Sequence, residues 1–186
     1  MSAKISILGF AGSLRKGSYN KSILNAAAEL LPPDVELKIF DLDGLPLFNQ
    51  DLESEPHEKV REFKAAIRAA DALLIATPEY NYSIPGVLKN AIDCASRPYG
   101  DNALDGKPVA IMGASIGTLG TARAQYHLRQ SCVFLNMFPL NGPEVMVAVA
   151  QDKIDAQGRL TDPGTRERIG ELVKSLAAWT QRLKQR

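Results

Sequence analysis

The residues best suited to chemistry lie in a glycine- and serine-rich segment, residues 12–20 (GSLRKGSYN), directly behind the apolar run 5–10. Gly12 and Gly17 permit a tight backbone path, and a helix that starts near the end of this segment presents free N–H groups to an anion. The side chains add a forked guanidinium and several hydroxyl or amide groups. These come from Ser13, Arg15, Ser18 and Asn20. The segment therefore predicts a phosphate cradle, with a ligand-free turn as the alternative.

Two well-known phosphate loops differ from this segment. The nucleoside triphosphate loop needs Lys and then Ser or Thr after its second glycine, whereas Gly17 is followed by Ser18 and Tyr19. The dinucleotide loop needs the pattern G-x-G-x-x-G, whereas the glycines here stand at positions 9, 12 and 17. The sequence therefore favours a monophosphate as the ligand.

Two further segments carry groups that suit a flat ring. Residues 77–86 (TPEYNYSIPG) contain two tyrosines, and Pro78 and Pro85 stiffen the chain around them. Residues 114–121 (ASIGTLGT) contain glycines that let the backbone approach the edge of a ring. Taken alone, the first could be a packed aromatic loop, and the second is a weak signal.

Apolar periodicity predicts alternating strands and helices that would position these segments. The predicted strands cover residues 5–10, 36–40, 72–76, 108–113 and 144–149, and the predicted helices cover 21–31, 56–70, 88–95, 124–135 and a last one from Pro163. This alternation predicts an α/β protein of three layers, α/β/α, with a five-stranded parallel sheet in the flavodoxin-like order 2-1-3-4-5. In that order the loops after strands 1, 3 and 4 converge at one edge. We expect one domain over residues 1–186.

Composition excludes several classes of function. The formal net charge of +1 gives no indication of a nucleic-acid surface, and no apolar run approaches the roughly 18 residues of a membrane span. The first residues, Met1 to Lys4, lead into a strand without a signal-type apolar region, so we expect a cytoplasmic protein. Cys94 and Cys132 fit reduced, packed thiols, and the sequence offers neither a metal site nor a hydrolytic triad.

A monophosphate cradle, an aromatic loop and a glycine-rich loop at one edge together describe a site for flavin mononucleotide (FMN). The sequence resembles the NADPH-dependent FMN reductases of the flavodoxin-like superfamily, in particular the bacterial quinone and chromate reductase branch. The resemblance rests on residues 12–20 and 78–83 (PEYNYS), and it extends through 89–93 (KNAID) and 120–125 (GTARAQ).

This resemblance implies specific roles for the residues of the three loops. The residues that it assigns to the FMN phosphate and its loop are Ser13, Arg15, Ser18, Tyr19 and Asn20. Those that it places along the isoalloxazine are Pro78, Glu79, Tyr80, Asn81 and Tyr82, with Ser115 and Gly117 at the border. The implied reaction is a ping-pong one: NADPH or NADH passes a hydride to the flavin and leaves, and a quinone, chromate or a related oxidant then takes the electrons. The flavin carries this chemistry, so no catalytic side chain is expected.

Two alternatives and a question of assembly stay open. An FMN-binding electron carrier or regulatory flavoprotein would use the same site, although the near-zero net charge and the basic pair Arg15-Lys16 favour a reductase. A domain that uses the fold only for subunit contacts is the other alternative. Similar reductases are homodimers, and some pair into tetramers. Arg123, just before the helix predicted at 124–135, and Tyr126 on it are candidate contacts, with Glu144 as a partner across a twofold axis, unless this helix face is simply solvated.

Overall fold

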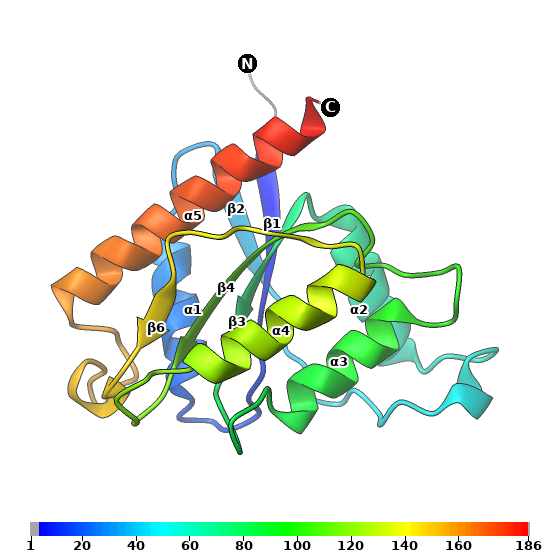
Figure 1. Cartoon of the computed structure of the whole chain (residues 1–186), viewed down its shortest axis with the longest axis horizontal. Coiled ribbons are helices and arrows are strands. Elements are labelled where there is room, and N and C mark those ends of the chain that lie inside the picture. The colour runs from blue at the N-terminus through cyan, green and yellow to red at the C-terminus, as the bar shows by residue number, and fades with distance from the viewer. Residues whose placement is uncertain (1–3, 186) are drawn as a thin grey trace.

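The computed structural model describes residues 4–185. The expectation that Met1 to Lys4 lead into the first strand therefore lies outside the described residues for Met1 to Ala3. Parallel strands form a central sheet with helices on both faces (Figure 1). The strands are β1 (Ile5–Ala11), β2 (Val35–Ile39), β3 (Ala72–Ala76), β4 (Pro108–Ala114), β5 (Phe138–Pro139) and β6 (Val145–Val147). The α-helices are α1 (Tyr19–Glu29), α2 (Glu58–Ala69), α3 (Gly86–Ser96), α4 (Ala122–Phe134) and α5 (Pro163–Lys184).

The sheet order is β2-β1-β3-β4-β5, and β6 also pairs with β4. The predicted three-layer α/β fold and its order are confirmed, but the predicted number of five strands is wrong because the sheet has six. The short strand β5 pairs with the start of β4, and β6 pairs with its end. Phe138 and Leu140 on either side of Pro139 still donate to the backbone around the start of β4. The chain then leaves β4 through a segment that contains Pro143, which has no N–H to donate, before β6 begins.

Helices α1 and α5 cover one face of the sheet, and α2, α3 and α4 cover the other (Figure 1). Each face has its own apolar core; one includes Ile7, Ile23 and Leu176, and the other includes Phe10, Phe63 and Leu88. Helix α1 starts at Tyr19, earlier than expected, because the Ser18 hydroxyl oxygen accepts the Lys21 N–H and so caps the helix. Among residues 4–185, no helix combines the length and apolar character that a membrane crossing requires.

The carboxyl end of β4 is packed too closely for any side chain at Gly113. A Cβ atom there would lie 1.9 Å from Thr121 Oγ1 and 2.3 Å from the Thr77 carbonyl oxygen. Glycine thus allows β4 to lie directly against the ends of β3 and the start of α4. This contact sets the relative positions of the loops that follow β3 and β4.

We expect Gly113→Ala to destabilise the protein by about 2 kcal/mol, because backbone at Thr77 must move to admit the methyl group. For a chain of this size that corresponds to a lowering of the melting temperature by roughly 4–8 °C, measured by thermal unfolding. Gly86→Ala is the matched control, since nothing lies within 4 Å of a Cβ built there. Equal melting temperatures for the two variants would contradict this account of Gly113.

Candidate functional site

The loop between β1 and α1 presents an unbroken run of unpaired backbone donors. From Ser13 to Asn20, no backbone N–H donates a hydrogen bond to any group within residues 4–185. Ser13 and Ser18 are nevertheless buried, and the first turn of α1 contains no acidic residue. Unpaired donors in a partly buried loop at a helix N-terminus, with no carboxylate to compete, fit a phosphate group.

Two side chains of this loop take different roles from one another. Arg15 is exposed, and its guanidinium carbon lies 5.1 Å from the centre of the Tyr19 ring. Asn20 is buried: its amide donates to the Ala114 carbonyl at 2.9 Å and accepts the Ala114 N–H at 2.9 Å. The Asn20 side chain therefore links the cradle to the end of β4, and its backbone N–H is the group left for an anion.

The loop after β3 folds into a tight hairpin. Tyr80 and Ser83 exchange two backbone hydrogen bonds of 3.0 Å, and Asn81 and Tyr82 between them have φ angles of 51° and 64°. Positive φ at both central residues is the type I′ geometry, which non-glycine residues seldom adopt. Tyr80 and Tyr82 remain 52% and 67% exposed. Pro78 is buried, and the N–H groups of Glu79, Asn81 and Tyr82 are unpaired within residues 4–185.

The Glu79 carboxylate points away from this hairpin, into α4. It accepts the backbone N–H groups of Arg123 and Ala124 at 3.0 and 3.2 Å and pairs with the Arg123 guanidinium. The hydrogen bond to Glu79 raises the pKa of Arg123 above its usual range. The pair joins residues 44 positions apart, which no local sequence pattern could have indicated.

The loop after β4 is stiffened by its own serine. The Ser115 hydroxyl donates to the Gly120 carbonyl at 2.7 Å and accepts the Gly117 N–H at 3.0 Å. Gly120 has a φ of +60°, and a Cβ atom there would lie 2.9 Å from the Met146 backbone, so glycine is required. The Ser115 side chain therefore shapes the loop, and Gly117 lies exposed on it.

The three loops meet at the carboxyl edge of the sheet, as the strand order predicts (Figure 1). The Gly12 N–H donates to the Ala76 carbonyl at 2.9 Å, and a Cβ on Gly12 would lie 3.1 Å from Pro85, which joins the first two loops. Asn20 joins the first loop to the third through Ala114. A cavity of about 600 Å³ lies elsewhere, beside α2, and its lining charges Lys64 and Asp101 are already paired with each other.

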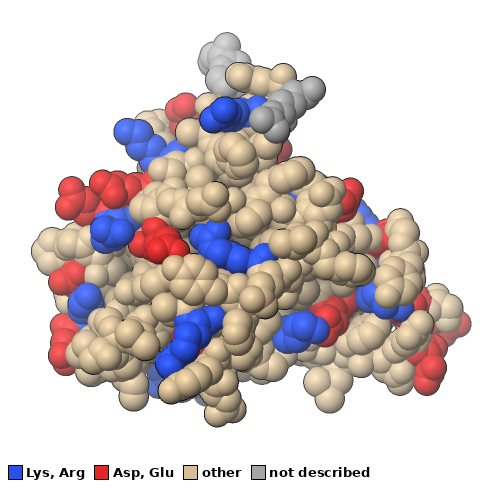
Figure 2. Space-filling model, in the orientation of Figure 1, with Lys and Arg blue, Asp and Glu red and all other residues tan. Residues whose placement is uncertain are grey.

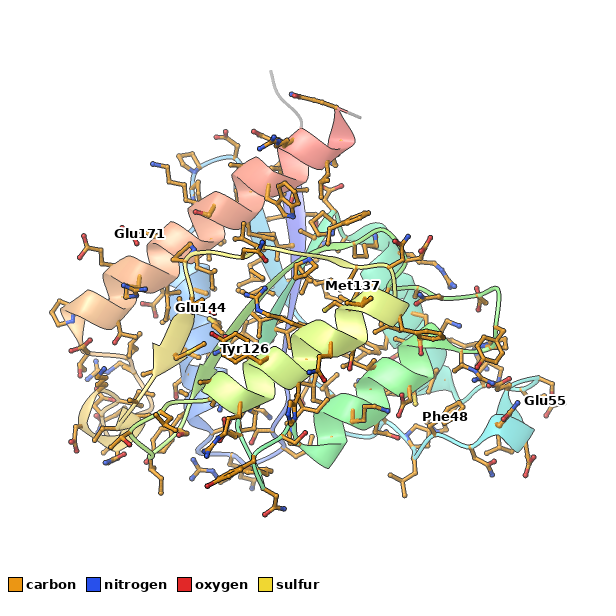
Figure 3. All side chains as sticks on the ribbon, in the orientation of Figure 1. Phe48, Glu55, Tyr126, Met137, Glu144 and Glu171 are labelled. Atoms are coloured by element: carbon orange, nitrogen blue, oxygen red, sulfur yellow. The ribbon has the colours of Figure 1, made fainter. Side chains whose placement is uncertain are left out.

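The candidate assembly residues make contacts inside this chain. Arg123 pairs with Glu79, and Tyr126 lies beside Glu144 (Figure 3), whose hydrogen bond raises the pKa of the tyrosine. The role of these residues between subunits therefore stays a prediction. Sequence reasoning missed two exposed apolar side chains at the end of α4, Val133 and Phe134, which are 82% and 79% exposed. The available signal was the helical period: Cys132 lies on the buried stripe of α4, so the next two residues fall on other faces of the helix.

The thiols and the titratable groups show no reactive cluster. Cys94 and Cys132 are unpaired and buried, and burial raises the pKa of both, that of Cys132 to about 11, despite the opposing charge of Arg129. Within residues 4–185, no group of three or more His, Cys, Asp or Glu side chains is placed to hold a metal ion.

Comparisons with known proteins identify the family of the chain. The family profile "NADPH-dependent FMN reductase" matches residues 5–152. An NAD(P)H-dependent FMN reductase from Pseudomonas aeruginosa is 54% identical, covering 99% of this chain and 100% of the relative. A 2-hydroxy-1,4-benzoquinone reductase from Burkholderia sp. is 45% identical, covering 97% of this chain and 98% of the relative.

A solved structure gives the same result for the fold. The flavoenzyme NAD(P)H:(acceptor) oxidoreductase from Paracoccus denitrificans superposes with a TM-score of 0.87 at 34% identity, covering 96% of this chain and 98% of that one. The chain thus belongs to the NADPH-dependent FMN reductase family, and it is an NAD(P)H-dependent flavoprotein oxidoreductase with FMN as its cofactor.

Proposed function

We propose that this chain reduces quinones with electrons from NADPH or NADH, and that its three carboxyl-edge loops hold the FMN. The main support for this position of the FMN phosphate is the run of unpaired N–H groups from Ser13 to Asn20 beside the exposed Arg15. The quinone as acceptor is supported by the Burkholderia relative, whose name specifies 2-hydroxy-1,4-benzoquinone. Chromate is a second acceptor that we propose, from the resemblance to the quinone and chromate reductase branch.

Each loop has a distinct task in this proposal. The backbone of residues 13–20, with the hydroxyls of Ser13 and Ser18 and the guanidinium of Arg15, binds the phosphate. Tyr19 belongs to the same loop and packs against Arg15. Asn20 holds the cradle in place through Ala114. The unpaired N–H groups of the hairpin and the exposed Gly117 border the ring. FMN, when bound, supplies two-electron chemistry by accepting a hydride from NAD(P)H and passing the electrons to the acceptor.

The exposed tyrosines of the hairpin favour one shared place for donor and acceptor. Tyr80 and Tyr82 leave much of their rings in solvent, and such rings can stack on a flat nicotinamide or quinone. Two planar reactants that use the same face must bind in turn. The protein then needs neither thiol, which agrees with the raised pKa values of Cys94 and Cys132.

We also propose that the protein works in the cytoplasm as a homodimer, with pairing of dimers into tetramers as a further step. Support comes from the exposed Val133 and Phe134, because large apolar side chains in solvent mark interaction surfaces. Figure 2 shows largely uncharged surface over this side of the molecule, broken by both basic and acidic side chains. Arg123, Tyr126 and Glu144 are the polar contacts that we propose nearby.

Steady-state kinetics should separate a reductase from an electron carrier. We expect NADPH oxidation at several fixed benzoquinone concentrations to give parallel double-reciprocal lines, because donor and acceptor use one place in turn. The same assay with NADH and with chromate ranks the alternative reactants. A protein that holds FMN but does not turn over NAD(P)H would be a carrier, and intersecting lines would contradict the shared place.

Arg15→Ala should weaken FMN binding. The change removes a charge-assisted contact to the phosphate, which corresponds to about 2 kcal/mol or roughly a thirtyfold higher Kd. Equilibrium dialysis of the purified protein against FMN measures this. Arg182→Ala, at the far end of α5, is the control for loss of a surface arginine. If the Kd is the same in both variants, the phosphate is bound elsewhere.

Light scattering after size-exclusion chromatography should give a mass of at least twice the 20.2 kDa chain. Phe134→Glu is expected to shift the protein toward the monomer, because a carboxylate resists burial in an apolar contact. Lys174→Glu, on the opposite side of the sheet, should leave the mass unchanged. A monomeric wild type would refute the dimer, and an unaffected Phe134→Glu variant would move the contact to another surface. Arg123→Ala tests the polar contact in the same way.

A further inference from the structure

Helix α4 begins without a cap of its own. The side chain of its N-cap residue, Thr121, accepts the Gln125 side-chain amide at 3.0 Å and caps no backbone N–H of the helix. The acceptor comes instead from the loop after β3, where Glu79 Oε2 receives the N–H groups of Arg123 and Ala124. The Glu79 side chain is only 5% exposed. A buried carboxylate at a helix N-terminus stabilises both the helix and the conformation of the loop that supplies it.

The contacts of the Glu79 carboxylate extend through Arg123 to the hairpin. Glu79 Oε1 accepts the Arg123 Nε–H, and the Arg123 guanidinium carbon lies 3.5 Å from the centre of the Tyr82 ring. The guanidinium is thus held by an anion on one side and covers an aromatic face on the other. Glu79, Arg123 and Tyr82 form a continuous chain of contacts from the start of α4 to the tip of the hairpin.

The hairpin needs such support because of its backbone. Tyr82 has a φ of 64°, in a region that a residue with a Cβ atom occupies only at an energetic cost. The two Tyr80–Ser83 backbone hydrogen bonds and the Ser83–His127 contact close the turn, and the stack with Arg123 is the contact that holds the largely exposed Tyr82 side chain itself. Glycine would adopt the same φ without this cost.

We propose that Glu79 is a positioning residue for the flavin: it fixes Arg123, which holds Tyr82 in the left-handed turn and so keeps the unpaired N–H groups of Asn81 and Tyr82 in one orientation. This inference rests on the proposed place of the flavin beside residues 78–82. It assigns Glu79 an indirect role, through its carboxylate, in place of a contact with the ring. The arrangement also predicts that the need for Glu79 disappears when the turn is stable by itself.

The test is a double-mutant cycle on FMN affinity, measured by equilibrium dialysis. Glu79→Gln keeps an acceptor for the α4 N–H groups but removes the charge that orders Arg123. We expect it to raise the FMN Kd about tenfold, the size of a lost charge-assisted hydrogen bond. In a Tyr82→Gly background the same substitution should change the Kd less than about twofold, because glycine holds the turn without the stack.

Two further variants keep the test decisive. Arg123→Met leaves its backbone N–H on Glu79 and removes only the guanidinium, so it should raise the Kd like Glu79→Gln and be rescued by Tyr82→Gly. It serves as the second route if Glu79→Gln fails to fold. Asp93→Asn is the matched control, because it breaks the exposed Lys89–Asp93 pair on α3 without touching the hairpin.

The outcomes separate this inference from the proposed function. An equal rise in Kd in the wild-type and in the Tyr82→Gly backgrounds would overturn the positioning role, since Glu79 would then act without the turn. Unchanged affinity in both Glu79→Gln and Arg123→Met would also overturn it. If Arg15→Ala and all the hairpin variants bind FMN with the same Kd as the wild type, the placement of the flavin itself would instead be contradicted.

Discussion

Two buried hydrogen bonds between the Asn20 amide and the backbone of Ala114 are the interaction on which the carboxyl edge depends. They join the start of α1 to the end of β4, which are 94 positions apart in the sequence. Without them the Ala114 N–H and carbonyl would be buried and unpaired at the point where the third loop begins, at a cost of about 1–3 kcal/mol for each group. The loop after β1 and the loop after β4 therefore hold one fixed relation to each other.

Around this tie, the loops of the carboxyl edge present mainly backbone donors. The groups available to a ligand in the first two loops are predominantly unpaired N–H groups, while Asn20, Glu79 and Ser115 direct their side chains into the protein. The side chains act as internal braces and the main chain presents the donors. Such donors are preorganised, because their positions are set by strands, caps and turns and change little when a ligand arrives.

The sequence predicts the fold well, because the fold depends on local signals. Apolar periodicity indicates each main strand, and the strand order then brings the three loops to one edge. The expected strand at 144–149 corresponds to β6, and the strand that was missed is β5, whose two residues are defined only by their pairing with the distant start of β4. The direction of Glu79 was missed for a similar reason: its partner Arg123 is distant in sequence and adjacent only after folding. The residue types show which hydrogen-bonding and charged groups are present. Only the tertiary structure determines which of these groups already have a partner within the protein.

The division of the last edge into β5 and β6 has a consequence for how this protein avoids unwanted association. A long parallel edge strand would expose a row of unpaired backbone groups on which another chain could add a strand. Here β5 covers only the start of β4 and β6 only its end, and Pro139 lacks an N–H altogether. The sheet therefore offers no continuous ladder to a neighbouring molecule on this side. Protection of this edge against association follows from two short strands and from Pro139, whose missing N–H faces away from β4.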